Sequence, residues 1–173
     1  MSVTNFKVIL IGAERVGKTS LVRRLIDNNF HEKTNPTDGC EIFVKTLRID
    51  DKSVNLTIWD VAEQVHVEDF RRYYPDARGF LLVFDLTDVA TFENLRWWII
   101  RARSACPKVP FIVVANKADL PNPFINQIRL GKVSKRLKAS GNILVSAKTG
   151  AGVTDAFKLL GRAIIAKLKI KKT

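Results

Sequence analysis

The sequence has few residues of the kinds that build disulfide frameworks, metal clusters and membrane spans. Its 173 residues include two cysteines, two histidines and one methionine. Cys40 and Cys106 lie far apart without metal-ligand spacing, which favours reduced structural thiols in a cytoplasmic protein over a disulfide scaffold. No apolar stretch approaches the roughly 18–20 residues of a membrane span, and there is no signal-peptide pattern.

Acidic residues are scarce toward the C-terminus. The net charge is +12, and residues 129–173 hold twelve Lys and Arg against one acid, Asp155. The helical pattern at 153–168 has one apolar face, so its basic residues are expected to face outward. They form either a solvated surface or a weak, salt-sensitive contact with an anionic membrane. No aromatic-and-basic stripe and no helix-turn-helix pattern supports a nucleic-acid partner.

Short apolar runs recur along the chain and alternate with helical patterns. The runs lie near 6–11, 54–59, 80–84, 111–115 and 143–145. This alternation predicts an α/β fold, with a mostly parallel sheet that has helices on both faces.

One hairpin interrupts the alternation. Residues 41–49 and 53–59 flank Asp50-Asp51-Lys52, which fits a turn between two antiparallel strands. The sequence shows no repeat, no low-complexity linker and no domain boundary. We therefore expect one domain over residues 1–173, with a basic tail at about 167–173.

A complete GxxxxGKT phosphate loop follows the first apolar run and precedes a helical pattern. It comprises Gly12, Ala13, Glu14, Arg15, Val16, Gly17, Lys18 and Thr19, with Ser20 directly after it. Its backbone N–H groups are expected to cradle phosphate oxygens, helped by the positive end of the helix. Lys18 would reach the β- and γ-phosphates, and the Thr19 hydroxyl would ligate Mg²⁺. The motif therefore predicts a site for a nucleoside triphosphate.

Two further motifs follow later strands. Asn116-Lys117-Ala118-Asp119 comes after residues 111–115, and Ser146-Ala147-Lys148 comes after residues 143–145. With these motifs, the chain resembles the Ras superfamily of small GTPases over nearly its whole length, most closely the Ras and Rab branches. The resemblance implies a P-loop GTPase fold (G domain) with six strands, in which the hairpin is the antiparallel exception.

The resemblance implies a guanine pocket. Asp119 would accept hydrogen bonds from the guanine N1–H and exocyclic amine, whereas adenine presents the opposite pattern and would leave the carboxylate unpaired. Asn116 would brace the pocket, and the Lys117 stem would cover the base. The Ala147 N–H would meet the guanine O6 between Ser146 and Lys148, and Phe30 has the spacing of the aromatic residue that covers the base.

The first switch of the family contains a threonine that closes on Mg²⁺ and the γ-phosphate. Thr37 fits that position, and Thr34 stands where a tyrosine often lies. Asp60, at the end of an apolar strand pattern, matches the aspartate that holds Mg²⁺ through water. The resemblance thus assigns Thr19, Thr37 and Asp60 to the metal.

The second switch departs from the family pattern Asp-x-x-Gly-Gln, because the chain reads Asp60-Val61-Ala62-Glu63-Gln64. Either Glu63 replaces the glycine and Gln64 positions the attacking water, or the glycine is deleted and Glu63 takes the glutamine position. We favour the first alignment, which also places Val67 and Phe70 at apolar positions of the family. The expected catalytic residues are then Lys18, Thr37 and Gln64.

The phosphate loop departs as well, since close relatives carry Gly, Ser or Ala where this chain has Glu14 and Arg15. Glu14 would crowd an attacking water and repel phosphate, so slow intrinsic GTP hydrolysis is expected. Arg15 could supply positive charge in cis, although an arginine at a loop tip more often points to solvent.

These motifs predict a GTP/GDP switch that uses residues around Thr37 and 60–74 to present an effector surface. The alternative is a hydrolysis-deficient, GTP-bound scaffold. Expected partners are effector, exchange-factor and GAP proteins acting on a monomer. No cysteine suited to prenylation lies near the C-terminal end of this sequence, and Ser2 replaces the glycine needed for N-myristoylation.

Overall fold

A computed structural model of the chain describes residues 4–31, 37–62, 72–121 and 123–170. A six-stranded sheet has the order β2-β3-β1-β4-β5-β6. Its strands are β1 (Thr4–Ile11), β2 (Cys40–Ile49), β3 (Lys52–Val61), β4 (Gly79–Asp85), β5 (Phe111–Asn116) and β6 (Gly141–Leu144). The helices are α1 (Lys18–Asp27), α3 (Val89–Glu93), α4 (Leu95–Ala105), α5 (Gln127–Leu137) and α6 (Val153–Ile170).

The pairing confirms the predicted mostly parallel sheet and its one exception. β1 pairs in parallel with β3 and β4, and β5 pairs in parallel with β4 and β6. β2 and β3 are antiparallel, with Cys40 opposite Val61 and Ile49 opposite Lys52. The predicted hairpin is therefore confirmed, and its tight turn lies at Asp50 and Asp51.

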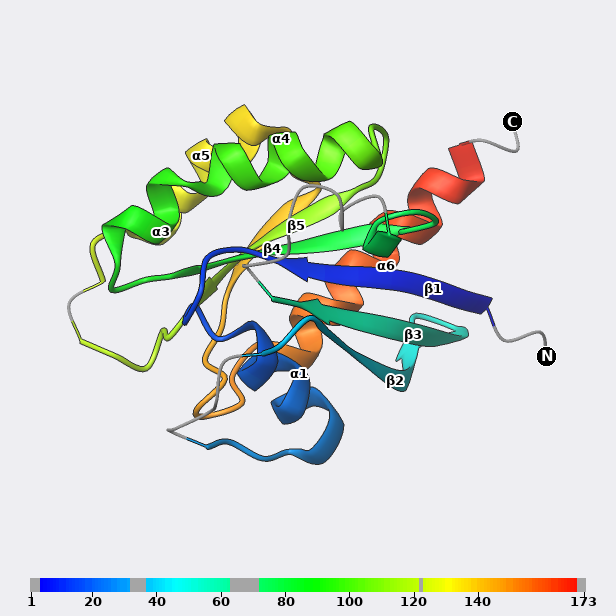
Figure 1. Cartoon of the computed structure of the whole chain (residues 1–173), viewed down its shortest axis with the longest axis horizontal. Coiled ribbons are helices and arrows are strands. Elements are labelled where there is room, and N and C mark those ends of the chain that lie inside the picture. The colour runs from blue at the N-terminus through cyan, green and yellow to red at the C-terminus, as the bar shows by residue number, and fades with distance from the viewer. Residues whose placement is uncertain (1–3, 32–36, 63–71, 122, 171–173) are drawn as a thin grey trace.

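Helices cover both faces of the sheet (Figure 1), with α1 and α6 on one face and α3, α4 and α5 on the other. Alternate residues of β1 point to opposite faces, as in any strand. Val8 and Leu10 belong to the core that includes α1 and α6, whereas Ile9 and Ile11 belong to the core beneath α4. The first apolar run thus supplies both cores.

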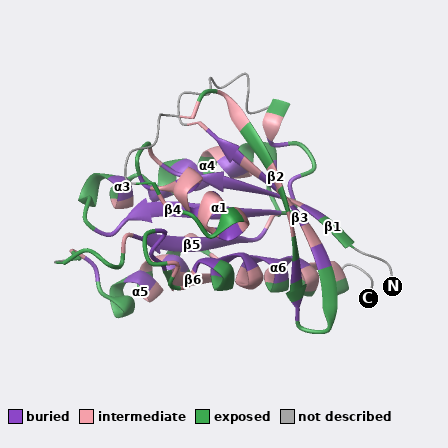
Figure 2. Ribbon diagram, turned by 90° about the horizontal axis from the view of Figure 1, so that it is seen from below, coloured by how far each residue is buried: buried purple, intermediate pink, exposed green. Residues whose placement is uncertain are grey.

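Burial is greatest in the middle of the sheet. Every residue of β4 and β5 is buried, while much of the β2–β3 hairpin is exposed (Figure 2). This difference explains why β4 and β5 are continuous apolar runs and why β2 alternates with polar residues.

The helices dock as their apolar patterns predict. The buried residues of α6 include Val153, Ala156, Phe157, Leu160 and Ile164. On α4, Trp98 is buried and Trp97 is 49% exposed, so one ring packs in the core and the other reaches solvent. No helix in the described part of the chain has the length and apolar character that crossing a bilayer requires.

The fold gathers the predicted motifs at one edge of the sheet. β1, β3, β4, β5 and β6 run in parallel, so the segments that follow their carboxyl ends lie at a common edge. This edge holds the phosphate loop, Asp60, Asp85, Asn116 and the 146–148 segment.

Candidate functional site

The phosphate loop is packed tightly against the sheet. Gly12 has a φ of 143°, and a Cβ there would overlap the backbone carbonyl of Val83 in β4. Gly17 has a φ of 94°, and a Cβ there would overlap the Asn116 amide. Both positions therefore require glycine, for conformation and for space.

Lys18 lies inside this loop, not on the surface. Its side chain is buried, and Nζ donates hydrogen bonds to the carbonyl oxygens of Gly12 and Ala13, each at 2.8 Å. The loop carbonyls hold the ammonium group at the mouth of α1, where the helix N-terminus adds positive potential. This arrangement suits a polyanionic ligand.

Three side-chain oxygens converge beside the loop. The Thr19 hydroxyl donates to Asp60 Oδ2 and lies 2.8 Å from the Thr37 hydroxyl. The three residues come from the start of α1, the segment before β2 and the end of β3. The structure thus brings together the three residues that the sequence assigns to a metal.

Asp60 is the most constrained member of this group. Its side chain is fully buried, and Oδ1 has no hydrogen-bond partner among the described residues. Burial raises the pKa of Asp60, while the Thr19 hydrogen bond and the Lys18 charge act in the opposite direction. A buried carboxylate oxygen with an unused lone pair, beside two hydroxyls, is a donor set that fits Mg²⁺.

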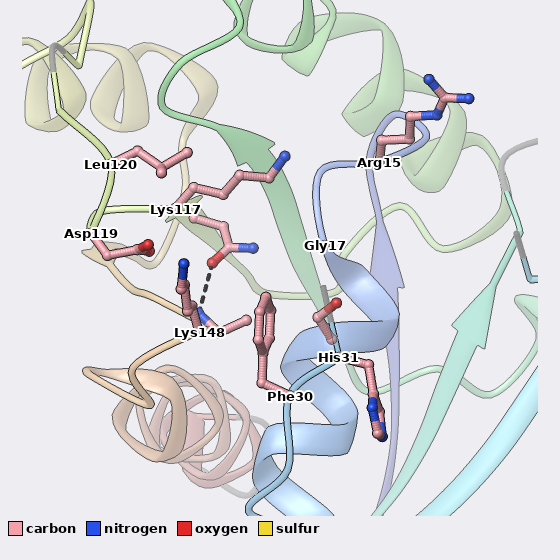
Figure 3. A pocket seen from close by; sticks show the side chains of 11 residues that line it. Arg15, Gly17, Phe30, His31, Lys117, Asp119, Leu120 and Lys148 are labelled. Atoms are coloured by element: carbon pink, nitrogen blue, oxygen red, sulfur yellow. Dashed lines mark hydrogen bonds between the residues drawn. The ribbon is translucent and has the colours of Figure 1, made fainter. Parts of the chain in front are cut away.

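A cavity of about 690 Å³ opens next to the loop (Figure 3). Its lining joins α1, the loop after β5 and the loop after β6. The lining residues are Arg15, Gly17, Ser20, Phe30, His31, Asn116, Lys117, Asp119, Leu120, Ala147 and Lys148. Nine of these eleven were expected at a nucleotide site, while His31 and Leu120 were not anticipated.

Asn116 links the three parts of this cavity. Its Nδ2 donates to the Val16 carbonyl at 2.8 Å, and its Oδ1 accepts from the Ala147 N–H at 3.1 Å. All four polar atoms of this network are buried, so each bond replaces contacts with water. The side chain thereby sets the spacing between the phosphate loop and the 146–148 segment.

Asp119 and Lys117 are held by separate partners. Ser146 Oγ donates to Asp119 Oδ1, which orients the carboxylate from the neighbouring loop. Lys117 Nζ pairs with Asp85 Oδ2 at 2.6 Å, and the Asp85 side chain is 9% exposed. Burial alone would raise the pKa of Asp85, but hydrogen bonds from Lys117 and Thr87 lower it below its usual value.

Arg24 also shapes the site, and sequence reasoning missed it. From the last turn of α1, its Nε donates to the Ala147 carbonyl at 2.8 Å, and its Nη2 donates to the Lys148 carbonyl. A basic residue on a helix gives no sequence signal of such a role, because its acceptors are main-chain carbonyls. For Asp85 the sequence gives a weak signal of a role in the site, because this acid ends β4, the strand beside β5.

Glu14 and Arg15 form the tip of the phosphate loop. Their closest charged atoms are 4.0 Å apart, and the Arg15 side chain is 89% exposed. Figure 3 shows Arg15 directed away from Lys117 and Asp119. This orientation agrees with the solvent-facing reading of Arg15. Glu63, Gln64, Thr34, Val67 and Phe70 lie outside the described residues.

Comparison with known proteins decides the family. A family model described as the Ras family matches residues 7–166. The chain belongs to the Ras family.

Among relatives of this Ras-family chain is Ras-related protein Rab-1A of Dictyostelium discoideum, 34% identical over 164 residues, with 92% of this chain and 80% of the relative covered. Ras-related protein Rab-18 of Caenorhabditis briggsae is 36% identical over 168 residues, with 94% and 81% covered. Human Ras-related protein Rab-4B is 33% identical over 166 residues, with 94% and 78% covered. The chain is therefore Rab-like, and it is a GTP-binding switch protein with GTPase activity.

Proposed function

We propose that residues 1–173 form a single G domain that binds GTP and GDP with Mg²⁺ and hydrolyses GTP slowly. The observation that carries this proposal is the convergence of the Thr19, Thr37 and Asp60 oxygens beside the buried Lys18. These groups come from three segments that meet at one edge of the sheet. Bound Mg²⁺ would supply positive charge for the β- and γ-phosphate oxygens.

The chain supplies the remaining phosphate contacts. The backbone N–H groups of residues 12–20 would contact the phosphate oxygens, and Lys18 would turn from the loop carbonyls toward the β- and γ-phosphates. Thr37 lies just before β2, so its hydroxyl links the first switch to Thr19 and Asp60, the other two residues proposed to hold Mg²⁺. Loss of the γ-phosphate removes one reason for Thr37 to stay there, which is how the nucleotide would set the conformation of this segment.

Guanine specificity follows from the cavity beside the loop. Asp119 would accept from the guanine N1–H and amine, and Ser146 keeps the carboxylate in position. The Lys117 stem and the Phe30 ring would lie on the two sides of the base. The Ala147 N–H and Lys148 complete the rim, with Asn116 fixing their distance from the phosphate loop.

Slow hydrolysis is proposed from the loop tip. The Glu14 side chain is 44% exposed and carries a carboxylate at a position where the family resemblance implies a small residue. Phosphoryl transfer depends on positioning and on stabilising spread negative charge, so a carboxylate at this point opposes it. We assign the positioning of the attacking water to Gln64.

Single-turnover hydrolysis of bound GTP tests the proposal. Wild-type protein with Mg²⁺ is expected to hydrolyse GTP at or below the intrinsic Ras rate, on the order of 10⁻⁴ s⁻¹. Chelation of Mg²⁺ should stop turnover and speed nucleotide release. Gln64→Leu should lower the rate and Glu63→Leu should not. The reverse pattern would favour the other alignment, and no turnover at all would favour a GTP-bound scaffold.

Partners and location follow from the same assignment. We propose that segments around Thr37 and 60–74 contact effector, exchange-factor and GAP proteins, and that the chain is a monomer. A cytoplasmic location agrees with the two thiols, which are free in the structure. Peripheral membrane contact through basic surface is proposed in addition.

A further inference from the structure

The outward faces of α4 and α5 combine exposed apolar side chains with excess positive charge. Trp97 and Ile100 on α4 are 49% and 57% exposed, and Ile128 on α5 is 72% exposed. Neither helix contains an acidic residue, and Asp119 is the only acid between Glu93 and Asp155.

The two helices are neighbours on one face of the sheet (Figure 1). Arg103 Nη2, near the end of α4, donates to the Leu137 carbonyl at the end of α5, at 3.2 Å. At the other end, Arg129 lies over the Phe92 ring, 5.7 Å from its centroid. The helices therefore run side by side in the same direction, each about 16 Å long.

Their outer sides form what we term the α4–α5 face. It consists of Trp97, Ile100, Ile128, Lys132, Lys135 and Arg136, all of which are exposed.

The exposed tryptophan is not needed for the core. The buried residues of α4 are Leu95, Trp98, Ile99 and Ala102. The Trp97 and Trp98 rings pack edge to face, with 4.8 Å between their centroids. The Arg101 guanidinium lies 4.2 Å from the centroid of the Trp97 ring. These contacts fix the orientation of the indole ring, while half of its surface stays open to solvent.

Building on the peripheral membrane contact proposed above, we propose that the α4–α5 face docks on the surface of an anionic phospholipid membrane. Tryptophan favours the headgroup region of a bilayer, where its amphipathic ring is partly dehydrated. Lysine and arginine around it are attracted by anionic lipid. Pairing with the same face of a second copy would oppose like charges, so charge complementarity favours the membrane over self-association.

The C-terminal end of α6 reaches this side of the molecule. Lys167 Nζ donates to the Lys108 carbonyl, in the segment that follows α4. The last turn of α6 thus contacts the segment between α4 and β5. Contact of the C-terminal region with a membrane is compatible with docking of the α4–α5 face.

Vesicle co-sedimentation of the full chain tests this assignment. The probes are phosphatidylcholine vesicles and mixed phosphatidylcholine–phosphatidylserine vesicles. Wild-type protein should bind the mixed vesicles and not the neutral ones. Lys132→Glu with Lys135→Glu should lower the partition coefficient by about tenfold or more, from two lost cationic contacts. Trp97→Gln should weaken binding with little change in its salt dependence, because it removes an apolar contact.

A matched control separates this face from net charge. Arg48→Glu with Lys52→Glu makes the same charge change on the exposed β2–β3 hairpin and should leave the partition coefficient within about twofold. Bound GDP, measured in every variant, shows that each is folded. Equal loss in the control pair, or no binding to mixed vesicles, would overturn the proposal. Binding to RNA or to an acidic peptide in preference to the mixed vesicles would overturn it in favour of that partner.

Discussion

Arg24 donates from Nε to the carbonyl oxygen of Ala147 at 2.8 Å, across 123 positions of the sequence. The same guanidinium group donates to the Lys148 carbonyl and to the Asn28 carbonyl that ends α1. One side chain therefore fastens the guanine-side loop to the helix that begins at the phosphate loop. The distance between the two ends of the nucleotide site is fixed by this link and by Asn116.

Arg24→Ala should speed the release of guanine nucleotide. The loss leaves loop carbonyls without a charged donor and lets the 146–148 segment move away from α1, so we expect about a tenfold faster dissociation of labelled GDP. The dissociation rate of Arg24→Lys should lie between those of wild type and Arg24→Ala, because an ammonium group cannot reproduce the forked geometry of a guanidinium group. Arg23→Ala is the matched control, since Arg23 also lies on α1 and, in the described part of the chain, forms a long ion pair with Glu41 at 3.9 Å. Equal release rates for both alanine variants would contradict the role of Arg24.

Asp119→Asn should weaken GDP binding by about 100-fold or more, because an amide cannot accept both guanine donors. The Ser146 hydrogen bond can persist, since Oδ1 of asparagine also accepts. The loss would then report on base recognition and not on loop position. Titration with labelled GDP measures it, with Asp51→Asn in the exposed hairpin turn as control. Unchanged GDP affinity would place the base elsewhere.

Glu14→Gly combined with Glu63→Gly should raise the rate of single-turnover GTP hydrolysis by about tenfold, because the first change removes a carboxylate expected to oppose phosphoryl transfer and the second restores the glycine of the family pattern. Arg15→Ala should leave the rate unchanged, since that side chain is 89% exposed. An unchanged rate in the double variant would show that slow turnover has another cause.

Asp85→Asn should lower the free energy of unfolding at neutral pH by about 2 kcal/mol, since Lys117 would lose a buried carboxylate partner. The native pKa of Asp85 lies below its ordinary value of 3.8. Its contribution is therefore present above that value and is lost as the pH falls through the lowered native pKa.

Denaturant unfolding in saturating GDP, repeated at falling pH, measures this contribution. The difference between wild type and Asp85→Asn should shrink toward acid. Asp88→Asn is the control, because asparagine caps a helix as well as aspartate does. A difference that does not change with pH would contradict the assignment.

Much of the architecture could be predicted from the sequence because the signals were redundant. Apolar runs gave the buried strands β4 and β5, and turn residues gave the β2–β3 hairpin. β6 was harder, since it begins at Gly141 and Asn142, which have low strand propensity. Pairing of Gly141 with Ile112 in β5 overrides that preference.

The predicted nucleotide site was recovered where a motif marks each residue. Arg24 and Asp85 were missed because their contacts join segments that are distant in sequence, and neither belongs to a local pattern. His31 and Leu120 were missed because many types of side chain can line a cavity, so neither residue belongs to a recognisable motif. Gln64 stays a prediction from the alignment that we favour.

The β2–β3 hairpin places a limit on how this chain can tolerate insertions. Thr37 and Asp60 both reach the Thr19 hydroxyl because ten residues of each strand pair in one register. The Ala62 N–H also donates to the Gly39 carbonyl at 2.9 Å. At the far end, Arg162 holds Asp50 at 2.9 Å. One residue added within either strand would turn every later side chain to the opposite face and separate the two oxygens. Insertions and deletions in relatives should therefore occur at the turn near Asp51, where an extra residue leaves the pairing of β2 with β3 unchanged.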